Sequence, residues 1–171
     1  NFEHTNASKS FFHDGTWWSI LPEQTSGQSA WSIYEFSEAL PAAGTVGGWE
    51  TASLPLFGSN YQADVAFDAA SGLLYVLMFS STDPAPKLLQ LSYSQQSRTW
   101  LLEATVELAS ELNPSIFGSN EDIGLGLDQY GNPLISAISS GINQGLYLAY
   151  SETSDLENWK SVTLDPDTSG N

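Results

Sequence analysis

The sequence predicts an all-β protein assembled from repeats of one four-stranded antiparallel unit, on three observations. The tetrapeptide Phe-Gly-Ser-Asn occurs twice, at 57–60 and 117–120. The match continues in the same register, so that Asp68 falls on Asp128 and the apolar run 74–78 falls on 134–138. Short apolar segments alternate with turn residues along the whole chain. Repetition of a small β unit predicts stacked sheets, because each unit needs neighbours to cover its two faces.

Each repeat is predicted to open with a hairpin. Segment 11–18 aligns with 67–75 and with 127–135, and the turn sequences are His13-Asp14-Gly15, Ala70-Ser71-Gly72 and Tyr130-Gly131-Asn132. Asp-Gly and Gly-Asn tolerate the positive φ of tight turns, so each pair of strands is expected to be antiparallel.

Two more strands are predicted in every repeat. The polar segments 22–30, 80–87 and 139–145 are interpreted as loops. The third strands are expected at 31–36, 88–93 and 146–151, where apolar and polar residues alternate most clearly in the second copy. The fourth strands open on Trp and are expected at 49–56, 100–108 and 159–164. The polar segment 109–113 is compatible with a short helical turn.

Four antiparallel strands in a repeated unit of 57 to 60 residues are typical of a β-propeller blade. We therefore predict one repeat domain over 1–171, with blade 1 at about 1–57, blade 2 at about 58–117 and blade 3 at about 118–171. Propeller rings have about four to eight blades, so three blades cannot close one. Either another copy or further blades of a longer chain are expected to close the ring.

Composition narrows the class of partner. The chain carries 4 Lys and Arg against 20 Asp and Glu, for a net charge of −16. Such a surface repels phosphate and anionic lipid, so we expect neither nucleic acid nor membrane as a partner. The acidity favours a secreted protein, extracellular or periplasmic, and the polar opening without an initiator Met suggests processing or trimming. The absence of Cys excludes disulfides, thiolate chemistry and Cys-based zinc sites.

The turn before the last Trp carries a resemblance to a known group. Thr153-Ser154-Asp155-Leu156-Glu157-Asn158-Trp159 resembles the Ser-x-Asp-x-Gly-x-Thr-Trp Asp box of sialidase-like propellers, and equally the Ser-x-Asp-Leu-x-x-Trp turn of five-bladed glycoside hydrolases. Segment 94–100 is a weaker version, and 14–18 is similar to the inner hairpin of bacterial sialidase-like repeats. The resemblance implies that Asp155 holds a turn on the face away from the ligand. A sialidase grips the sugar carboxylate with several arginines, whereas this sequence has one, Arg98, so sialidase activity is not expected of these three blades.

The inner strand of a propeller blade starts at the ligand face, beside the central channel. The polar residues expected there combine amides, carboxylates and a phenol, which suits a hydroxyl-rich sugar or a hard cation. The tryptophans as a group are expected to pack between blades, with Trp31 as the exception because it opens a strand beside the ligand-side loop. The candidate ligand-binding residues are Asn60, Tyr61, Asn120, Trp31 and Asn143.

Asp64, together with Glu121 or Asp122, forms the candidate acid–base pair. Glycosidases place two carboxyl groups about 5 to 9.5 Å apart, and inner strands of adjacent blades could do this. The alternative is that these side chains cap loops or face water. No cofactor and no metal site are predicted, because His4 and His13 are isolated and no Asp-x-Asp-x-Asp-Gly loop occurs, although calcium stays open.

These observations together favour an extracellular, non-catalytic propeller module that binds a glycan or a protein surface partner. One alternative is a part of a glycoside hydrolase with its acid–base carboxylates at the inner strand starts. Another is a structural module that completes a ring by oligomerisation, because end blades expose apolar faces that need a partner.

Overall fold

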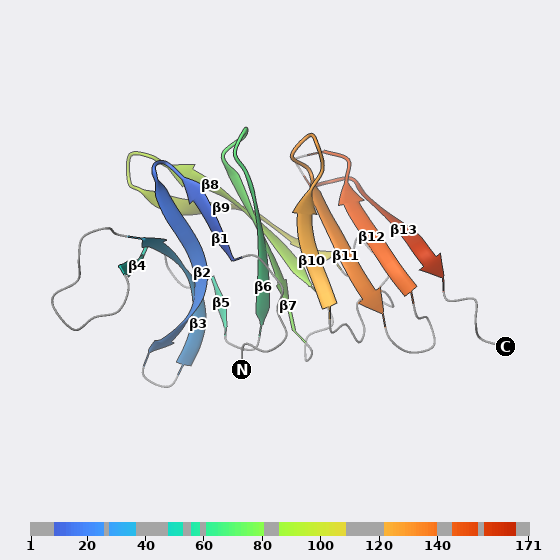
Figure 1. Cartoon of the computed structure of the whole chain (residues 1–171), viewed down its shortest axis with the longest axis horizontal. Helices are drawn as coiled ribbons and strands as arrows, with labels where there is room; N and C mark the ends of the chain where they lie inside the picture. The colour runs from blue at the N-terminus through green and yellow to red at the C-terminus, as the bar shows by residue number, and fades with distance from the viewer. Residues whose placement is uncertain are drawn as a thin grey trace.

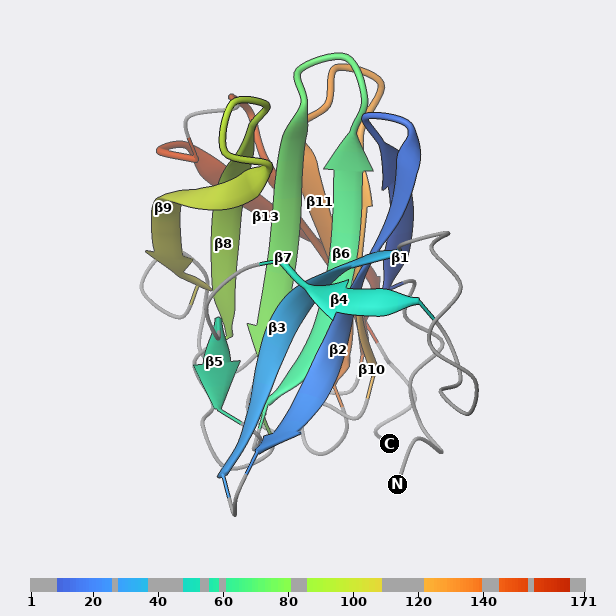
Figure 2. The same cartoon turned by 90° about the vertical axis from the view of Figure 1, so that its left-hand side faces the viewer.

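The computed structural model describes residues 9–25, 28–36, 48–52, 56–58, 61–80, 86–108, 122–139, 145–153 and 156–166. These residues form three antiparallel sheets that lie in series like propeller blades and do not close a ring (Figure 1). Viewed from the side of the first sheet, the second lies behind it and the third lies behind the second (Figure 2). The predicted all-β fold of four-stranded blade-like units is therefore confirmed. In the ranges given above, no helix is long and apolar enough to cross a bilayer.

The sheets follow the order of the chain. Sheet 1 contains β1 (Ser10–His13), β2 (Thr16–Thr25), β3 (Gln28–Phe36), β4 (Trp49–Thr51) and β5 (Phe57–Gly58). Sheet 2 contains β6 (Gln62–Asp68), β7 (Leu73–Phe79), β8 (Lys87–Ser94) and β9 (Thr99–Glu107). Sheet 3 contains β10 (Asp122–Leu127), β11 (Pro133–Ser139), β12 (Gly145–Ser151) and β13 (Trp159–Pro166). Neighbours along the chain pair as in a meander, except that β5 pairs with β3 instead of β4.

The polar segment 22–30 was predicted as a loop, and this prediction is wrong. β2 and β3 pair without a break from Trp18↔Glu35 to Thr25↔Gln28. Strand pairing uses backbone groups, so polar side chains do not prevent two strands from extending past the core. Polarity alone was therefore a poor sign of a loop here.

The fourth strand of sheet 1, predicted over 49–56, is divided into two pieces. β4 pairs with β3 at Tyr34↔Thr51, whereas β5 pairs with it at Trp31↔Phe57. Between these two pairs β3 spans three residues, from Tyr34 to Trp31, whereas the edge segment spans six, from Thr51 to Phe57. The edge segment therefore contains an insertion of three residues relative to β3. Its pairing persists on both sides of the insertion, because Ala52 N–H and Leu56 N–H donate to β3 carbonyls at 2.8 and 2.7 Å.

The hairpin turns explain why the repeat is so visible in the sequence. Asp68 Oδ1 accepts the Ala70 N–H at 3.0 Å, and Asp128 Oδ1 accepts the Tyr130 N–H at 2.8 Å, so the two aligned carboxylates hold equivalent turns. The third-sheet turn is one residue shorter, since Phe67 pairs with Leu74 whereas Leu127 pairs with Pro133. The predicted alignment of 74–78 with 134–138 is therefore wrong by one residue.

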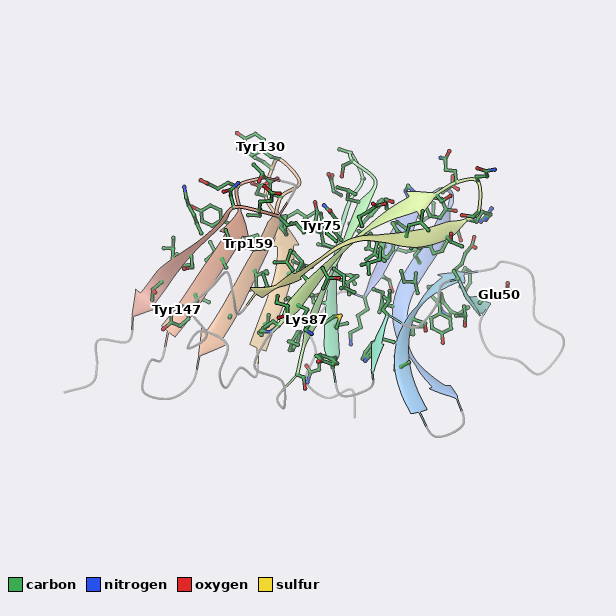
Figure 3. All side chains as sticks on the ribbon, turned by 180° about the vertical axis from the view of Figure 1, so that it is seen from behind. Glu50, Tyr75, Lys87, Tyr130, Tyr147 and Trp159 are labelled. Atoms are coloured by element: carbon green, nitrogen blue, oxygen red, sulfur yellow. The ribbon has the colours of Figure 1, made fainter. Side chains whose placement is uncertain are left out.

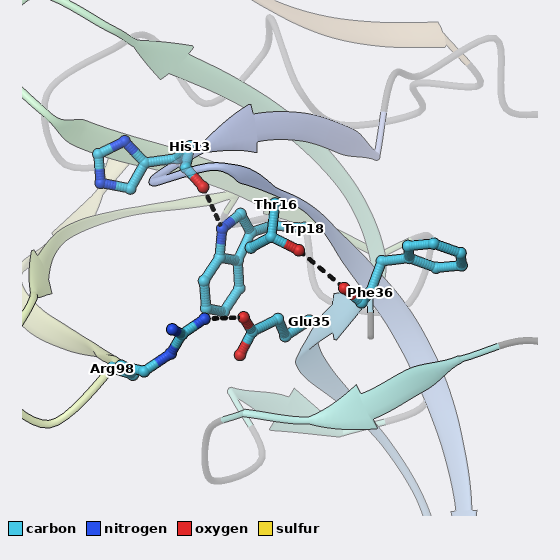
Figure 4. A network of polar contacts seen from close by, with 6 residues as sticks. All are labelled: His13, Thr16, Trp18, Glu35, Phe36 and Arg98. Atoms are coloured by element: carbon cyan, nitrogen blue, oxygen red, sulfur yellow. Dashed lines mark hydrogen bonds and ion pairs between the residues drawn. The ribbon is translucent and has the colours of Figure 1, made fainter. Parts of the chain in front are cut away.

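Aromatic rings fill the space between sheets 1 and 2. Phe11 stacks on Phe67 at 5.2 Å between centroids, and Trp18 meets Trp100 edge to face at 5.7 Å. Figure 4 shows how the Trp18 indole is fixed, with Nε1 donating to the His13 carbonyl at 3.0 Å. These contacts combine large apolar burial with a preferred ring geometry, and they hold sheet 1 against sheet 2.

One ion pair also joins these two sheets. Arg98, in the β8–β9 turn of sheet 2, donates to Glu35 of β3 beside the Trp18 ring (Figure 4). The guanidinium is well exposed, so the ion pair contributes little to the stability of the fold beyond holding the β8–β9 turn in place.

Sheets 2 and 3 meet through a second, mainly aliphatic core. Tyr75 and Leu77 of β7 and Leu88 of β8 are completely buried against Ile135 and Ala149 of sheet 3. Figure 3 shows Tyr75 between the two sheets, with Tyr147 and Trp159 on sheet 3. The apolar face of each sheet is thus buried by packing against the neighbouring sheet, as expected of stacked repeats.

Candidate functional site at the inner strands

The inner strands of the three sheets, β1, β6 and β10, lie next to one another. Where β1 and β6 begin, four residues come together: Lys9 before β1, Trp31 of β3, Tyr61 before β6, and Asp64 of β6. We call these four residues the inner-strand cluster. Three of them, Trp31, Tyr61 and Asp64, were predicted as site residues from the sequence.

Asp64 is the most constrained member of the cluster. Its side chain is 5% exposed. Oδ1 accepts the N–H of Val65, and Oδ2 accepts the N–H of Leu125 in sheet 3, both at 2.8 Å. The carboxylate is therefore bound to the backbone of two sheets and joins β6 to β10.

Burial raises the pKa of the Asp64 carboxyl above its ordinary value of 3.8. The N–H groups of Leu125 and Val65, together with the charge of Lys9, act in the opposite direction because they stabilise the ionised form. The effect of desolvation is larger than these contributions, so the pKa of Asp64 is raised overall.

Gly124 occupies the position on β10 that corresponds to Asp64 on β6, sixty residues earlier. A Cβ atom at Gly124 would lie 3.1 Å from Ser136 Oγ and 4.0 Å from Asp64 Oδ2. Glycine therefore leaves the backbone of β10 room beside Ser136 and the carboxylate. The apolar positions of β6 thus recur in β10, whereas the aspartate does not.

The other three members link sheets 1 and 2. Trp31 is 7% exposed, and its Nε1 donates to the Tyr61 carbonyl at 2.9 Å. Lys9 Nζ lies 4.7 Å from the centroid of the Trp31 ring, which is a cation–π distance. Burial lowers the pKa of Lys9, and Asp64 partly opposes that shift. The Trp31 ring is thus packed in the core and covered by an ammonium group.

This geometry limits the chemistry that Asp64 can perform. A general acid or base must reach the substrate with a free oxygen. Both Asp64 oxygens already accept backbone N–H groups, and breaking either bond would leave an unsatisfied buried donor. The arrangement suits a structural carboxylate next to a polar, partly exposed rim formed by Lys9, Tyr61 and Gln62.

Several predicted site residues lie outside the described residues, namely Asn60, Asn120, Glu121 and Asn143. Asp122 begins β10 opposite Ile138, but its side chain is not described. The predicted pairing of Asp64 with Glu121 or Asp122 therefore stays a prediction, and so do the ligand-binding roles.

Lys9 is the residue of this site that the sequence reasoning missed as a candidate. It immediately precedes the first inner strand, whose hairpin turn is shorter than those of the other two sheets, so the repeat alignment does not point to it. An isolated basic residue in a chain with four Lys and Arg was the available signal.

Within the described side chains, no group of three or more His, Asp or Glu residues is arranged to hold a metal ion. Asp155 of the Asp-box-like turn lies outside the described residues, as does segment 109–113. The described part of that turn is anchored by Trp159, whose Nε1 donates to the Leu156 carbonyl at 2.9 Å, and Leu156 has a φ of 63°.

Comparison of the chain with protein-family models, curated proteins and solved structures gave no match.

Proposed function

We propose that the chain is an extracellular, non-catalytic β-propeller module that binds a glycan at the inner-strand cluster. The observation that carries this proposal is the position of Lys9, held over Trp31 and beside Asp64 at the start of the inner strands. In the proposed propeller this is the end of the channel where ligand-side loops converge.

The chemistry of the rim supports a hydroxyl-rich ligand. Lys9 supplies an ammonium donor, the exposed Gln62 supplies an amide, and Tyr61 supplies a phenol. A few polar groups of this kind on a firm apolar base are typical of sites that orient a small polar ligand. The base here is Trp31, which is fixed by its hydrogen bond to Tyr61.

The bonding of Asp64 supports the non-catalytic assignment. Its oxygens hold the N–H groups of Val65 and Leu125, so its role is to fix the site rather than to exchange protons with a substrate. The net charge of −16 is consistent with secretion.

A second candidate function is glycoside hydrolysis, and one observation favours it. Burial raises the pKa of Asp64, as a general acid would require. This candidate needs a second carboxylate and a free Asp64 oxygen, so we rank it below glycan binding.

A glycan array followed by calorimetric titration of the best ligand tests the proposal. We expect binding by the wild-type chain and a loss of at least about tenfold in affinity, or about 1.4 kcal/mol, in Lys9→Gln. Lys160→Gln is the matched control, because it removes the same charge from an ion pair with Glu152 on sheet 3. An array without binding, or equal losses in both variants, would contradict the proposal.

Assay of sugar release by wild type and Asp64→Asn separates the two candidates. The binding proposal predicts no sugar release by either protein under conditions in which the wild type binds the glycan. Hydrolysis by the wild type that disappears in Asp64→Asn, with the fold intact, would establish the second candidate instead.

A further inference from the structure

Within the described residues, sheet 1 and sheet 3 each pack on sheet 2 through one face only, so each has an outer face that no other described sheet covers. On sheet 3, strand residues alternate between the core with sheet 2, as Ile135 and Ala137 do, and the opposite side. The residues on the opposite side, which we call the aliphatic face, are Leu134, Ile138, Leu146, Leu148 and Val162. Ile138 is 53% exposed and Val162 is 44% exposed.

The same positions are buried in sheet 2. Asp64 pairs with Leu77 and Gly124 pairs with Ser136, so Phe79, two residues after Leu77, corresponds to Ile138. Phe79 is 6% exposed because sheet 3 covers it. The aliphatic face therefore occupies positions that a following sheet covers elsewhere in the same chain.

Sheet 1 has the complementary open face. Phe12 and Trp17 pair across β1 and β2 with ring centroids 5.5 Å apart, and both are about half exposed. Phe36 and Trp49, which pair across β3 and β4 on the same side, have centroids 5.3 Å apart. These four residues form the aromatic face, on the side of sheet 1 opposite to sheet 2.

The side chains that make up the two faces are all uncharged, although the chain has a net charge of −16. On sheet 1, Glu35 and Glu50 pair with each other on the side that carries Trp18, opposite to the aromatic face. On sheet 3, the charged positions lie at the two ends of the aliphatic face: Asp122 and Asp165 pair with Ile138 and Leu146 at one end, and Lys160 forms an ion pair with Glu152 at the other. Contiguous apolar surface of this kind on an acidic protein marks an interface. When the aliphatic face of one copy meets the aromatic face of another, the acidic positions at the margin of the first face lie against uncharged aromatic residues of the second.

We propose that the occupant of each face is a second copy of this chain, with the aromatic face of one copy packed on the aliphatic face of the other. Two such contacts, related by a twofold axis, place six sheets in one ring, which lies within the usual range for propellers. Each contact repeats the sheet-on-sheet packing already present twice in the chain. The proposal does not depend on glycan binding.

Sedimentation velocity with the full chain over a range of concentrations tests the proposal. The expected mass is twice the 18.5 kDa of one chain. Trp17→Glu and Ile138→Glu each place a charge in both contacts, since both copies carry the change, and should weaken the dimer by at least about tenfold. Leu101→Glu is the matched control, because Leu101 is 49% exposed on sheet 2 and lies outside both faces.

Mixing the two variants identifies the mode of contact. In a Trp17→Glu plus Ile138→Glu mixture, one of the two contacts has both faces intact, so the proposal predicts that a mixed dimer forms where neither variant dimerises alone. Far-ultraviolet circular dichroism confirms that each variant is folded. A monomeric wild type, a dimer insensitive to either change, or a failure of the mixture to associate would overturn the proposal; the first result would favour further blades or another protein as the occupant.

Discussion

The Asp64 carboxylate of sheet 2 accepts a 2.8 Å hydrogen bond from the backbone N–H of Leu125 in sheet 3. The bond crosses between inner strands that lie sixty-one positions apart in the sequence. It satisfies a backbone donor on the edge of β10, and it ties the orientation of sheet 3 to that of sheet 2. Asp64 therefore acts here as a clamp between repeats.

The clamp predicts a specific pH dependence. The folded protein raises the pKa of Asp64, so it binds the proton more tightly than the unfolded chain does. The stability that results is present below the ordinary pKa of 3.8 and is lost as pH rises through the folded pKa. We expect the destabilisation caused by Asp64→Asn to be largest near pH 4 and to decrease toward neutrality, as measured by urea denaturation. A cost that grows with pH would show instead that the ionised form, paired with Lys9, is the stabilising one.

Asp68 and Asp128 predict the opposite change: here stability decreases as the pH falls. The Ser71 hydroxyl is the main cause of the lowered pKa of Asp68. At Asp128 burial acts against the shift, but N–H groups of Asn132 and Tyr130 lower the pKa overall. Their stabilising effect is present above 3.8 and is lost as pH falls through the lowered folded values. Melting temperatures measured from pH 5 to 2 should fall less steeply in Asp68→Asn/Asp128→Asn than in wild type. Parallel curves would contradict this role.

The hairpin turns of sheets 2 and 3 touch, and glycine substitutions test that contact. Gly131 has a φ of +83°, and a Cβ there would lie 2.5 Å from Asp68 Oδ2. Gly72 has a φ of +73° with nothing within 4 Å. Gly72→Ala should cost about 1–2 kcal/mol from backbone strain alone, and Gly131→Ala should cost more because it also displaces an anchored carboxylate. Equal denaturation midpoints for the two variants would argue against contact between the turns.

The core between sheets 2 and 3 predicts a large difference between two leucines. Leu77 is completely buried, whereas Leu101 is 49% exposed. Leu77→Ala should lower the free energy of unfolding by about 2–5 kcal/mol, because it removes packing and leaves a cavity. Leu101→Ala should change it by only about 0.5 kcal/mol. Similar losses at both sites, measured by chemical denaturation, would contradict the packing of sheet 2 on sheet 3.

The repeated fold was predictable because it depends on local signals that recur. Asp68 and Asp128 hold equivalent turns, and the aligned apolar residues around them form equivalent strands, so one period in the sequence indicates one sheet. The segment 22–30 was misread because its strands are defined by backbone pairing, which polar side chains do not reveal. The edge of sheet 1 was misread because an insertion of three residues leaves the pairing on both sides intact.

The inner-strand cluster was only partly predictable. Trp31, Tyr61 and Asp64 were expected near the channel from their places at strand starts. That Asp64 bonds to Leu125, and that Lys9 lies over Trp31, depends on how sheets pack against each other, which no local pattern encodes.

Amide hydrogen exchange at Leu125, compared in wild type and Asp64→Ala, tests the clamp most directly. Val76, within sheet 2, serves as the internal reference. We predict that the protection of the Leu125 N–H relative to Val76 falls by about tenfold or more in Asp64→Ala, matching the loss of a hydrogen bond worth about 1–3 kcal/mol. Unchanged relative protection in a folded variant would contradict the assignment of Asp64 as the residue that joins sheet 2 to sheet 3.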